Sequence, residues 1–221
     1  MKYLLGAIET VPLLLDGLLT SLLICGLAAI LALLGAVAIV AARRSGIRWL
    51  AVSATVYVTL MRGLPIVILV FLLYFGVPAL LDLGRVSALW VGVTALAMNG
   101  AAFQSEVLRG AIARLSTGQS EGAYALGLSR FQLWRLVLTP QILPIALPAL
   151  AGEMGFLIKA SPVLSLITVV DLTRRAQQVT MQTFDPLGPL LAACILYFFL
   201  IGSISWVSRY LEARLTVGRA R

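Results

Sequence analysis

The sequence predicts an all-α polytopic membrane protein with five transmembrane helices, because it is strongly apolar and contains long uncharged runs. Hydrophobic residues make up 61% of its 221 residues, whereas ordinary globular chains contain roughly 45–50%. A helix needs about 20 mostly apolar residues to cross the hydrocarbon core of a bilayer. The apolar runs do not alternate with a period of two, which argues against a β-barrel. We therefore expect residues 1–221 to form a single transmembrane domain.

The uncharged runs locate the expected spans. Runs without any charged residue occupy segments 17–42, 63–81, 86–105 and 186–208. With their flanking residues, and with a further apolar stretch before residue 170, we expect spans at about 13–42, 49–77, 86–112, 140–162 and 187–208. The fourth span carries Glu153 and Lys159 at membrane depth. Cys25 and Cys194 fall in two different spans and are interpreted as small core residues, not as a disulfide.

Basic residues are distributed unevenly about these spans and indicate their orientation. Eleven lie on one side: Arg43, Arg44, Arg48, Arg109, Arg114, Arg130, Arg135, Arg209, Arg214, Arg219 and Arg221. Four lie on the other: Lys2, Arg85, Arg174 and Arg175. Since cytoplasmic loops carry the excess of lysine and arginine, we expect the N-terminus outside and the C-terminus in the cytoplasm. The basic residues flank hydrophobic ends, so the net charge of +8 does not indicate nucleic-acid binding.

The longest cytoplasmic loop, about residues 116–139, is expected to form two short helices. Ser116, with a glutamine three residues later, has the form of a capping box that starts the first helix. Gly127 suits a left-handed cap at the end of that helix. Ser129 and Gln132 repeat the capping-box pattern and start the second helix.

Two interpretations of this loop stay open on spacing alone. Small residues at Gly122 and Ala123 would let a partner protein approach closely, which favours a docking element. Alternatively, the loop is an amphipathic hairpin that rests on lipid with Phe131 and Trp134 inserted. Pro140 is expected in the first turn of the fourth span.

The stretch EGAYALGLSRFQLWRLVLTPQILPIALP resembles the EAA loop of ATP-binding-cassette importer permeases, which have a MetI-like transmembrane domain. The matching residues are Glu121, Gly122, Ala123, Gly127, Ile142, Leu143 and Pro144. Gly122 stands where that family usually has alanine. Segments 57–78, 101–123 and 152–167 resemble stretches of the polar amino-acid permeases of the histidine, glutamine, arginine and opine type. They depart from that pattern at Leu64, Phe103, Gly152, Ala160 and Pro162.

The resemblance implies a permease subunit in the bacterial inner membrane, with specific partners. These are a dimer of ATPase subunits, a second permease subunit that is identical or homologous, and an extracytoplasmic amino-acid-binding protein. The loop would form coupling helices that dock on the ATPase through Glu121, Gly122, Ala123, Gly127 and Leu128. ATP and Mg²⁺ would bind to the ATPase, so this chain is expected to bind no cofactor or metal and not to be an enzyme itself.

The chain lacks the residues for ATP hydrolysis. A P-loop needs a lysine followed by serine or threonine, but the only lysines are Lys2 and Lys159, and alanine follows the second. The chain has no histidine, which excludes histidine proton relays and histidine metal ligands. Transport energy must come from a partner or from an ion gradient, so an ion-coupled secondary transporter that uses Glu153 is the alternative function. The loop motif favours the ATPase-driven permease.

Several polar residues of the second and third spans are expected at membrane depth. Pro65 should disrupt the helix near Arg62, and the freed carbonyl groups are candidate partners of the guanidinium. The pattern favours a structural role for Arg62. Asn99 and Glu106 fall on one face of the third span; Asn99 is a candidate for the substrate path, whereas Glu106 is expected to pair with Arg109 in a structural role.

Glu153 and Lys159 are the remaining candidates for the substrate path. Glu153 lies about 13 residues into the fourth span, roughly 20 Å from its cytoplasmic start. A carboxylate on the lipid-facing side at that depth would cost at least a few kcal/mol, so Glu153 should face the path or a partner charge. It either contacts the substrate or braces another helix. Lys159 is too far around the helix to pair with it and is expected to lie nearer the outer side.

Overall fold

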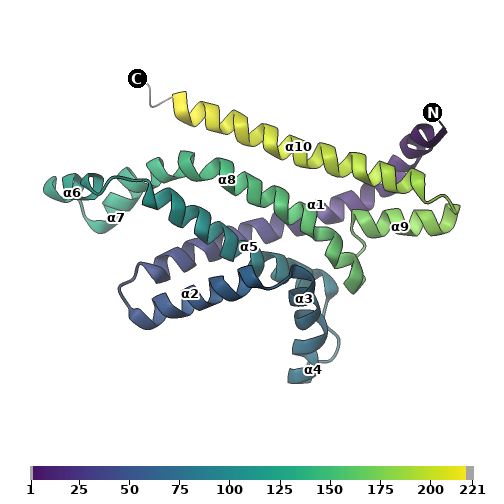
Figure 1. Cartoon of the computed structure of the whole chain (residues 1–221), viewed down its shortest axis with the longest axis horizontal. Helices are drawn as coiled ribbons and strands as arrows, with labels where there is room; N and C mark the ends of the chain where they lie inside the picture. The colour runs from purple at the N-terminus through teal and green to yellow at the C-terminus, as the bar shows by residue number, and fades with distance from the viewer. Residues whose placement is uncertain (1, 218–221) are drawn as a thin grey trace.

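The computed structural model describes the backbone of residues 2–217 and the side chains of residues 6–214, and every regular element in that range is a helix (Figure 1). This confirms the all-α class. The long helices are α1 (Lys2–Arg43), α2 (Arg48–Gly63), α5 (Ala88–Ala113), α8 (Thr139–Ala160) and α10 (Leu187–Val217). The short ones are α3 (Ile66–Phe71), η1 (Leu72–Gly76), α4 (Val77–Leu81), α6 (Gly118–Ala125), α7 (Arg130–Gln132), η2 (Leu133–Leu138), η3 (Ser161–Ile167) and α9 (Leu172–Thr183). The side chain of Lys2, and residues Arg219 and Arg221, lie outside this description.

The long apolar helices agree in part with the expected spans. Segments Gly6–Arg43, Arg130–Ile167 and Leu187–Arg214 are long and apolar enough to cross a membrane, and α2 with α3–α4 would make a fourth span if the bent pair counts as one. The helix α5, expected as the third span, is less apolar because it carries the buried polar residues Asn99, Gln104 and Ser105. The count of five spans therefore stays a prediction.

Helix α5 occupies the centre of the molecule and packs closely against α1. Ala28 and Ala32 of α1 are fully buried, and a Cβ added at Gly35 would lie 2.9 Å from the Cβ of Ala101 on α5. Such small residues let two helix backbones approach in a membrane, where the contact is made by close packing and not by exclusion of water. Helices α2 and α8 pack on other sides of α5.

The expected second span, residues 49–77, is broken where Pro65 is expected to disrupt it. Helix α2 ends at Gly63, Leu64 takes an extended conformation, and α3 begins after Pro65. The two parts meet at an angle of 108°, and α3, η1 and α4 project away from the other helices (Figure 1). Proline cannot donate a backbone hydrogen bond, and it disfavours the helical conformation of the residue before it, which explains the break at Leu64.

The two ends of the helical array differ in what they carry. Helices α6 and α7 lie at the same end as the turn between α1 and α2, whereas α9 lies at the opposite end with the start of α1 (Figure 1). Helix α9 is pinned against α1, since a Cβ at Gly17 would lie 2.7 Å from the Cβ of Arg175. Helix α1 begins earlier than predicted and runs for 42 residues with Pro12 inside it.

Candidate functional site

Helices α6 and α7 form the predicted pair of short helices in the loop, and Gly127 separates them. Its φ of +77° is left-handed, where a residue with a Cβ is strained. The backbone N–H of Leu128 donates to the Ala123 carbonyl at 3.0 Å, and that of Gly127 to the Tyr124 carbonyl at 2.9 Å. These are the two hydrogen bonds of a Schellman motif, so the predicted glycine cap is confirmed.

The second capping box is confirmed, but the first is wrong. The backbone N–H of Gln132 donates to Ser129 Oγ at 3.3 Å, and its side-chain oxygen accepts from the Ser129 N–H at 2.8 Å. Helix α6 begins with Thr117 at its N-cap and has no side-chain cap. The side-chain oxygen of Gln119 instead accepts from Nε2 of Gln141 at 3.1 Å, which ties α6 to α8.

Pro140 lies in the first turn of α8, as predicted, and the second loop helix runs on into α8 without a break. Residues Arg130–Ile167 form one continuous segment. A π-helical turn, η2, ends two residues before Pro140, and the Thr139 N–H donates to the Trp134 carbonyl five residues before it. Pro140 cannot donate to a carbonyl one turn earlier, and the π turn widens the helix at the point where that bond is missing.

Of the loop residues expected to dock on a partner, some are exposed and others are not. Glu121 and Gly122 are exposed, while Ala123 is buried beneath them and Leu128 is half-buried. Of the two aromatic residues that a lipid-inserted hairpin would need, Phe131 is exposed. Trp134 is half-buried, and the guanidinium of Arg44 lies 5.7 Å from its ring centroid. Both interpretations of the loop therefore stay predictions.

A polar contact links α2 to α5 beside the break at Pro65. The amide nitrogen of Asn99 donates to the Met61 carbonyl at 2.9 Å. In an unbroken helix that carbonyl would accept from residue 65, which is a proline. Asn99 is buried at 4% exposure, so the structure places this residue, predicted for the substrate path, in a contact between helices.

Arg62 lies against an aromatic ring and not against the freed carbonyl group. Its guanidinium carbon is 5.4 Å from the ring centroid of Phe103 on α5. The ring of Phe103 in turn lies 5.9 Å from that of Phe156 on α8. The Met61 carbonyl, a sequence-predicted partner of the guanidinium, is taken by Asn99. Arg62, Phe103 and Phe156 thus link α2, α5 and α8.

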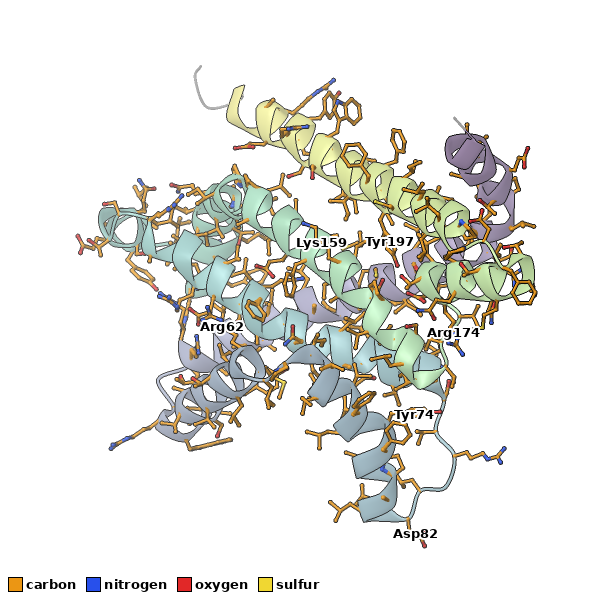
Figure 2. All side chains as sticks on the ribbon, turned by 45° about the vertical axis from the view of Figure 1, so that its right-hand side comes forward. Arg62, Tyr74, Asp82, Lys159, Arg174 and Tyr197 are labelled. Carbon is orange, nitrogen blue, oxygen red and sulfur yellow. The ribbon has the colours of Figure 1, made fainter. Side chains whose placement is uncertain are left out.

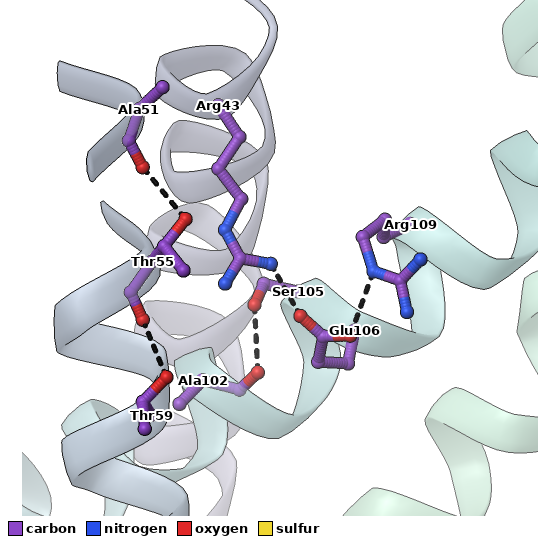
Figure 3. A network of polar contacts seen from close by, with 8 residues as sticks. All are labelled: Arg43, Ala51, Thr55, Thr59, Ala102, Ser105, Glu106 and Arg109. Atoms are coloured by element: carbon purple, nitrogen blue, oxygen red, sulfur yellow. Dashed lines mark hydrogen bonds and ion pairs between the residues drawn. The ribbon is translucent and has the colours of Figure 1, made fainter. Parts of the chain in front are cut away.

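Glu106 joins the end of α1 to α5 (Figure 3). It accepts from Nε of Arg109 at 2.8 Å, which confirms the predicted pair. It also forms an ion pair with Arg43 of α1. Sequence reasoning missed Arg43, because no local pattern relates residues that lie 63 positions apart.

Glu153 and Lys159 lie on α8 and are not paired with each other. Glu153 is half-buried and within electrostatic reach of Arg62, whereas Lys159 is exposed (Figure 2). Neither residue forms an ion pair with any side chain in residues 6–214. A cavity of about 440 Å³ between α8 and α10 is lined by Ala151 and Met154, but Glu153 does not line it. Arg62 of α2, Phe103 of α5, and Phe156 and Glu153 of α8 therefore lie near one another.

A buried carboxyl group, not predicted from the sequence, lies beside α9, at the end of the molecule opposite to α6 and α7. Asp171 is 1% exposed, and its Oδ1 accepts from the Arg174 N–H at 2.8 Å as the N-cap of α9. The Tyr197 hydroxyl lies 3.0 Å from Thr173 Oγ1 beside it. Burial raises the pKa of Asp171 above its ordinary value. A lone aspartate in an outer loop gives no sequence signal that it will be enclosed.

Comparisons with known proteins agree over nearly the whole chain. The model of the family "binding-protein-dependent transport system inner membrane component" matches residues 32–217. The arginine transport system permease protein ArtQ of Bacillus subtilis (strain 168) is 32% identical over 210 residues, which cover 95% of each chain. The putative glutamine transport system permease protein GlnP of Rickettsia typhi is 30% identical over 98% of this chain and 99% of its own.

A solved structure is also similar over nearly the whole length of the chain. The crystal structure of an amino acid ABC transporter with histidines contains a chain that superimposes with a TM-score of 0.85 at 30% identity. The match covers 96% of this chain and 98% of that one. The arrangement of α1, α5, α8 and α10 is therefore shared with a transporter subunit along its full length.

Proposed function

The chain belongs to the family of inner membrane components of binding-protein-dependent transport systems, and on that premise we propose that it is the permease subunit of an ATP-driven importer of polar amino acids. The observation that carries this proposal is the similarity to the arginine permease over 95% of both chains. The ion-coupled alternative has no support among the relatives and the structure named above.

The membrane arrangement belongs to the same proposal. Residues 1–221 form one transmembrane domain of five spans, in which α5 is the enclosed third span and the bent α2–α4 segment is the second. The N-terminus is outside and the C-terminus is cytoplasmic. The support is the excess of basic residues on one side and the position of α6 and α7 at the end of the molecule opposite to α9 (Figure 1).

Helices α6 and α7 form the contact with a separate ATPase. Glu121 and Gly122 are exposed on α6, and the Gly127 cap, with Leu128 after it, fixes the angle between the two helices. Because η2 continues directly into α8, a displacement of this loop by the ATPase moves the helix that carries Glu153. A second permease and an extracytoplasmic binding protein complete the transporter, and ATP with Mg²⁺ binds to the ATPase.

Glu153 lines the path and contacts the amino or cationic group of the substrate. The support is its half-buried position near Arg62, without a carboxylate–cation pair among the described side chains. The relatives are named for arginine and glutamine, and both molecules carry a positively charged amino group that a carboxylate would attract.

Reconstitution tests the function directly. The chain, its co-purified ATPase and the binding protein are placed in liposomes, and uptake of labelled arginine, glutamine and histidine is measured with ATP inside the lumen that faces the ATPase. We expect ATP-dependent accumulation of at least one amino acid. Uptake that follows an imposed proton or sodium gradient and ignores ATP would refute the proposal.

A further inference from the structure

Two cavities meet at one end of the helical array and share part of their lining. The first, of about 640 Å³, lies between the turn after α1 and the loop helices. The second, of about 570 Å³, lies between α1, α5 and α8. Arg44, Arg130 and Trp134 line both cavities. The two cavities are therefore neighbouring parts of one site.

The first cavity carries an excess of positive charge. The charged side chains that line it are Arg43, Arg44 and Arg130. Arg43 shares Glu106 with Arg109, whereas neither Arg44 nor Arg130 forms an ion pair within residues 6–214. The Nε–H of Arg43 is buried and has no acceptor among the described residues. A buried donor without an acceptor is costly, so the site is complementary to an anion that accepts several hydrogen bonds.

The second cavity is an apolar groove that leads away from these arginines. It follows α1 from Arg44 to Leu33, eleven residues that rise about 16 Å along a helix. Half of a hydrocarbon core of about 30 Å has a similar depth. Val37 is 55% exposed and Leu143 on the facing helix α8 is 47% exposed, so the groove is open at its side.

We propose that the two cavities together bind an anionic phospholipid, with its phosphate at Arg44, Arg130 and the free Nε–H of Arg43 and with one acyl chain in the groove. Basic pockets between transmembrane helices attract anionic lipid headgroups. A soluble phosphate would use the arginines but not the apolar groove, and the net negative charge of an anionic lipid matches the excess of arginine better than a zwitterionic headgroup does. Only the assignment to the cytoplasmic leaflet rests on the orientation proposed above.

Bound lipid at this site would reach the coupling loop. Ser120 and Tyr124 of α6 and Trp134 of η2 line the same headgroup cavity. The lipid therefore holds the loop helices against the end of α1, and the anionic lipid content of the membrane sets how firmly α6 is held.

Thermal unfolding of the full chain in detergent tests the proposal. The probes are phosphatidylglycerol, phosphatidylcholine with the same acyl chains, and inorganic phosphate. Phosphatidylglycerol should raise the melting temperature most, because a ligand that binds the folded state stabilises it. In the double variant Arg44→Gln/Arg130→Gln its apparent affinity should fall about fivefold for each arginine removed, given about 1 kcal/mol per basic residue at an anionic surface.

Three further variants separate a lipid from other anions and from a general effect of charge. Val37→Trp fills the groove without changing charge and should also weaken the phosphatidylglycerol effect. Arg48→Gln and Val52→Trp, at exposed positions on α2 that line neither cavity, should leave it unchanged. The proposal is overturned if phosphatidylcholine or phosphate alone reproduces the full shift, if Val37→Trp has no effect, or if the α2 controls lose the response equally.

Discussion

At the scale of single residues, Asn99 supplies the hydrogen bond that Pro65 cannot make to the Met61 carbonyl. We expect Asn99→Leu, which keeps the size but removes the donor, to destabilise the folded chain by about 1–3 kcal/mol, the usual cost of a buried polar group left without a partner. Thermal unfolding in detergent measures this effect. Thr94→Val, at an exposed position of the same helix, is the control, and equal stability of both variants would contradict the role given to Asn99.

Glu153 offers a test of the substrate path at one carboxylate. Glu153→Gln keeps the shape and removes the charge, so the amino-acid concentration for half-maximal uptake should rise about tenfold or more, as expected for loss of a charged hydrogen bond. Glu9→Gln, at an exposed position of α1, is the matched control. Unchanged uptake and selectivity would refute the contact, and failure of the transporter to assemble would show that Glu153 braces helices instead.

Asp171 makes stability depend on pH. Because the pKa of its buried carboxyl is raised in the folded chain, the folded state holds a proton that the unfolded state releases. Stability from this group is therefore present below its ordinary pKa of 3.8 and is lost as the pH rises through the folded value. Asp171→Asn keeps an N-cap residue without the charge, so it should be at least as stable as the parent chain at pH 7.5, with an advantage that shrinks toward pH 4.

Asp171→Ala separates the cap from the charge. It removes the N-cap of α9 as well and should lose about 1 kcal/mol relative to Asp171→Asn at both pH values. Melting temperatures at the two pH values give the comparison. If asparagine and alanine are equally destabilising at pH 7.5, the carboxylate itself is required and the argument from burial fails.

At the scale of elements, the turn between α6 and α7 depends on the left-handed backbone of Gly127. Gly127→Val should strain this turn, because a β-branched residue is disfavoured at positive φ, and Glu121→Lys should reverse the charge at the docking surface. Both variants should insert normally but lose ATP-driven uptake and the stimulation of ATP hydrolysis by the binding protein. Gly202→Ala, at an exposed position of α10 outside the loop and with no atom near the added Cβ, is the control and should be neutral. Normal uptake by both of the first two variants would contradict the coupling role.

Local signals predicted these elements where the partners are close in sequence. The cap at Gly127 and the capping box at Ser129 involve residues within a few positions of each other, so the sequence was sufficient. The same pattern failed at Ser116, because Gln119 bonds to Gln141, 22 positions away. Pro65 predicted a break in α2 but not its angle of 108°, because that angle depends on the helices against which α3 packs.

At the scale of the whole molecule, the contacts that hold the helices together join distant parts of the chain. Sequence reasoning could identify Glu106 as a structural residue, but the ion pair with Arg43 depends on how α1 crosses α5. The same holds for the close approach of Gly35 to Ala101: small residues predict a helix contact but not which helix provides it. The position of Glu153 near Arg62 also depends on this packing, so its depth was predictable whereas its neighbours were not.

The expected orientation of the whole molecule rests on the excess of basic residues on one side of the spans and can be tested by labelling. We expect residues 43–48, 114–138 and 209–221 in the cytoplasm, and 79–85 and 171–186 outside. Cys25 is buried but Cys194 is exposed, so Cys194 is first replaced by alanine. Single cysteines are then introduced at the exposed positions Leu83, Ala125 and Gln182 and treated with a membrane-impermeant maleimide in intact cells.

The cysteines at positions 83 and 182 should react from outside, and the one at position 125 should react only after the membrane is permeabilised. Positions 83 and 125 lie on either side of α5, so opposite reactivity requires this helix to cross the membrane although it carries buried polar residues. Because α5 is enclosed by α1, α2 and α8, those polar groups meet protein and not lipid. Labelling of position 125 in intact cells would invert the orientation, and equal labelling of positions 83 and 125 would remove α5 from the set of spans.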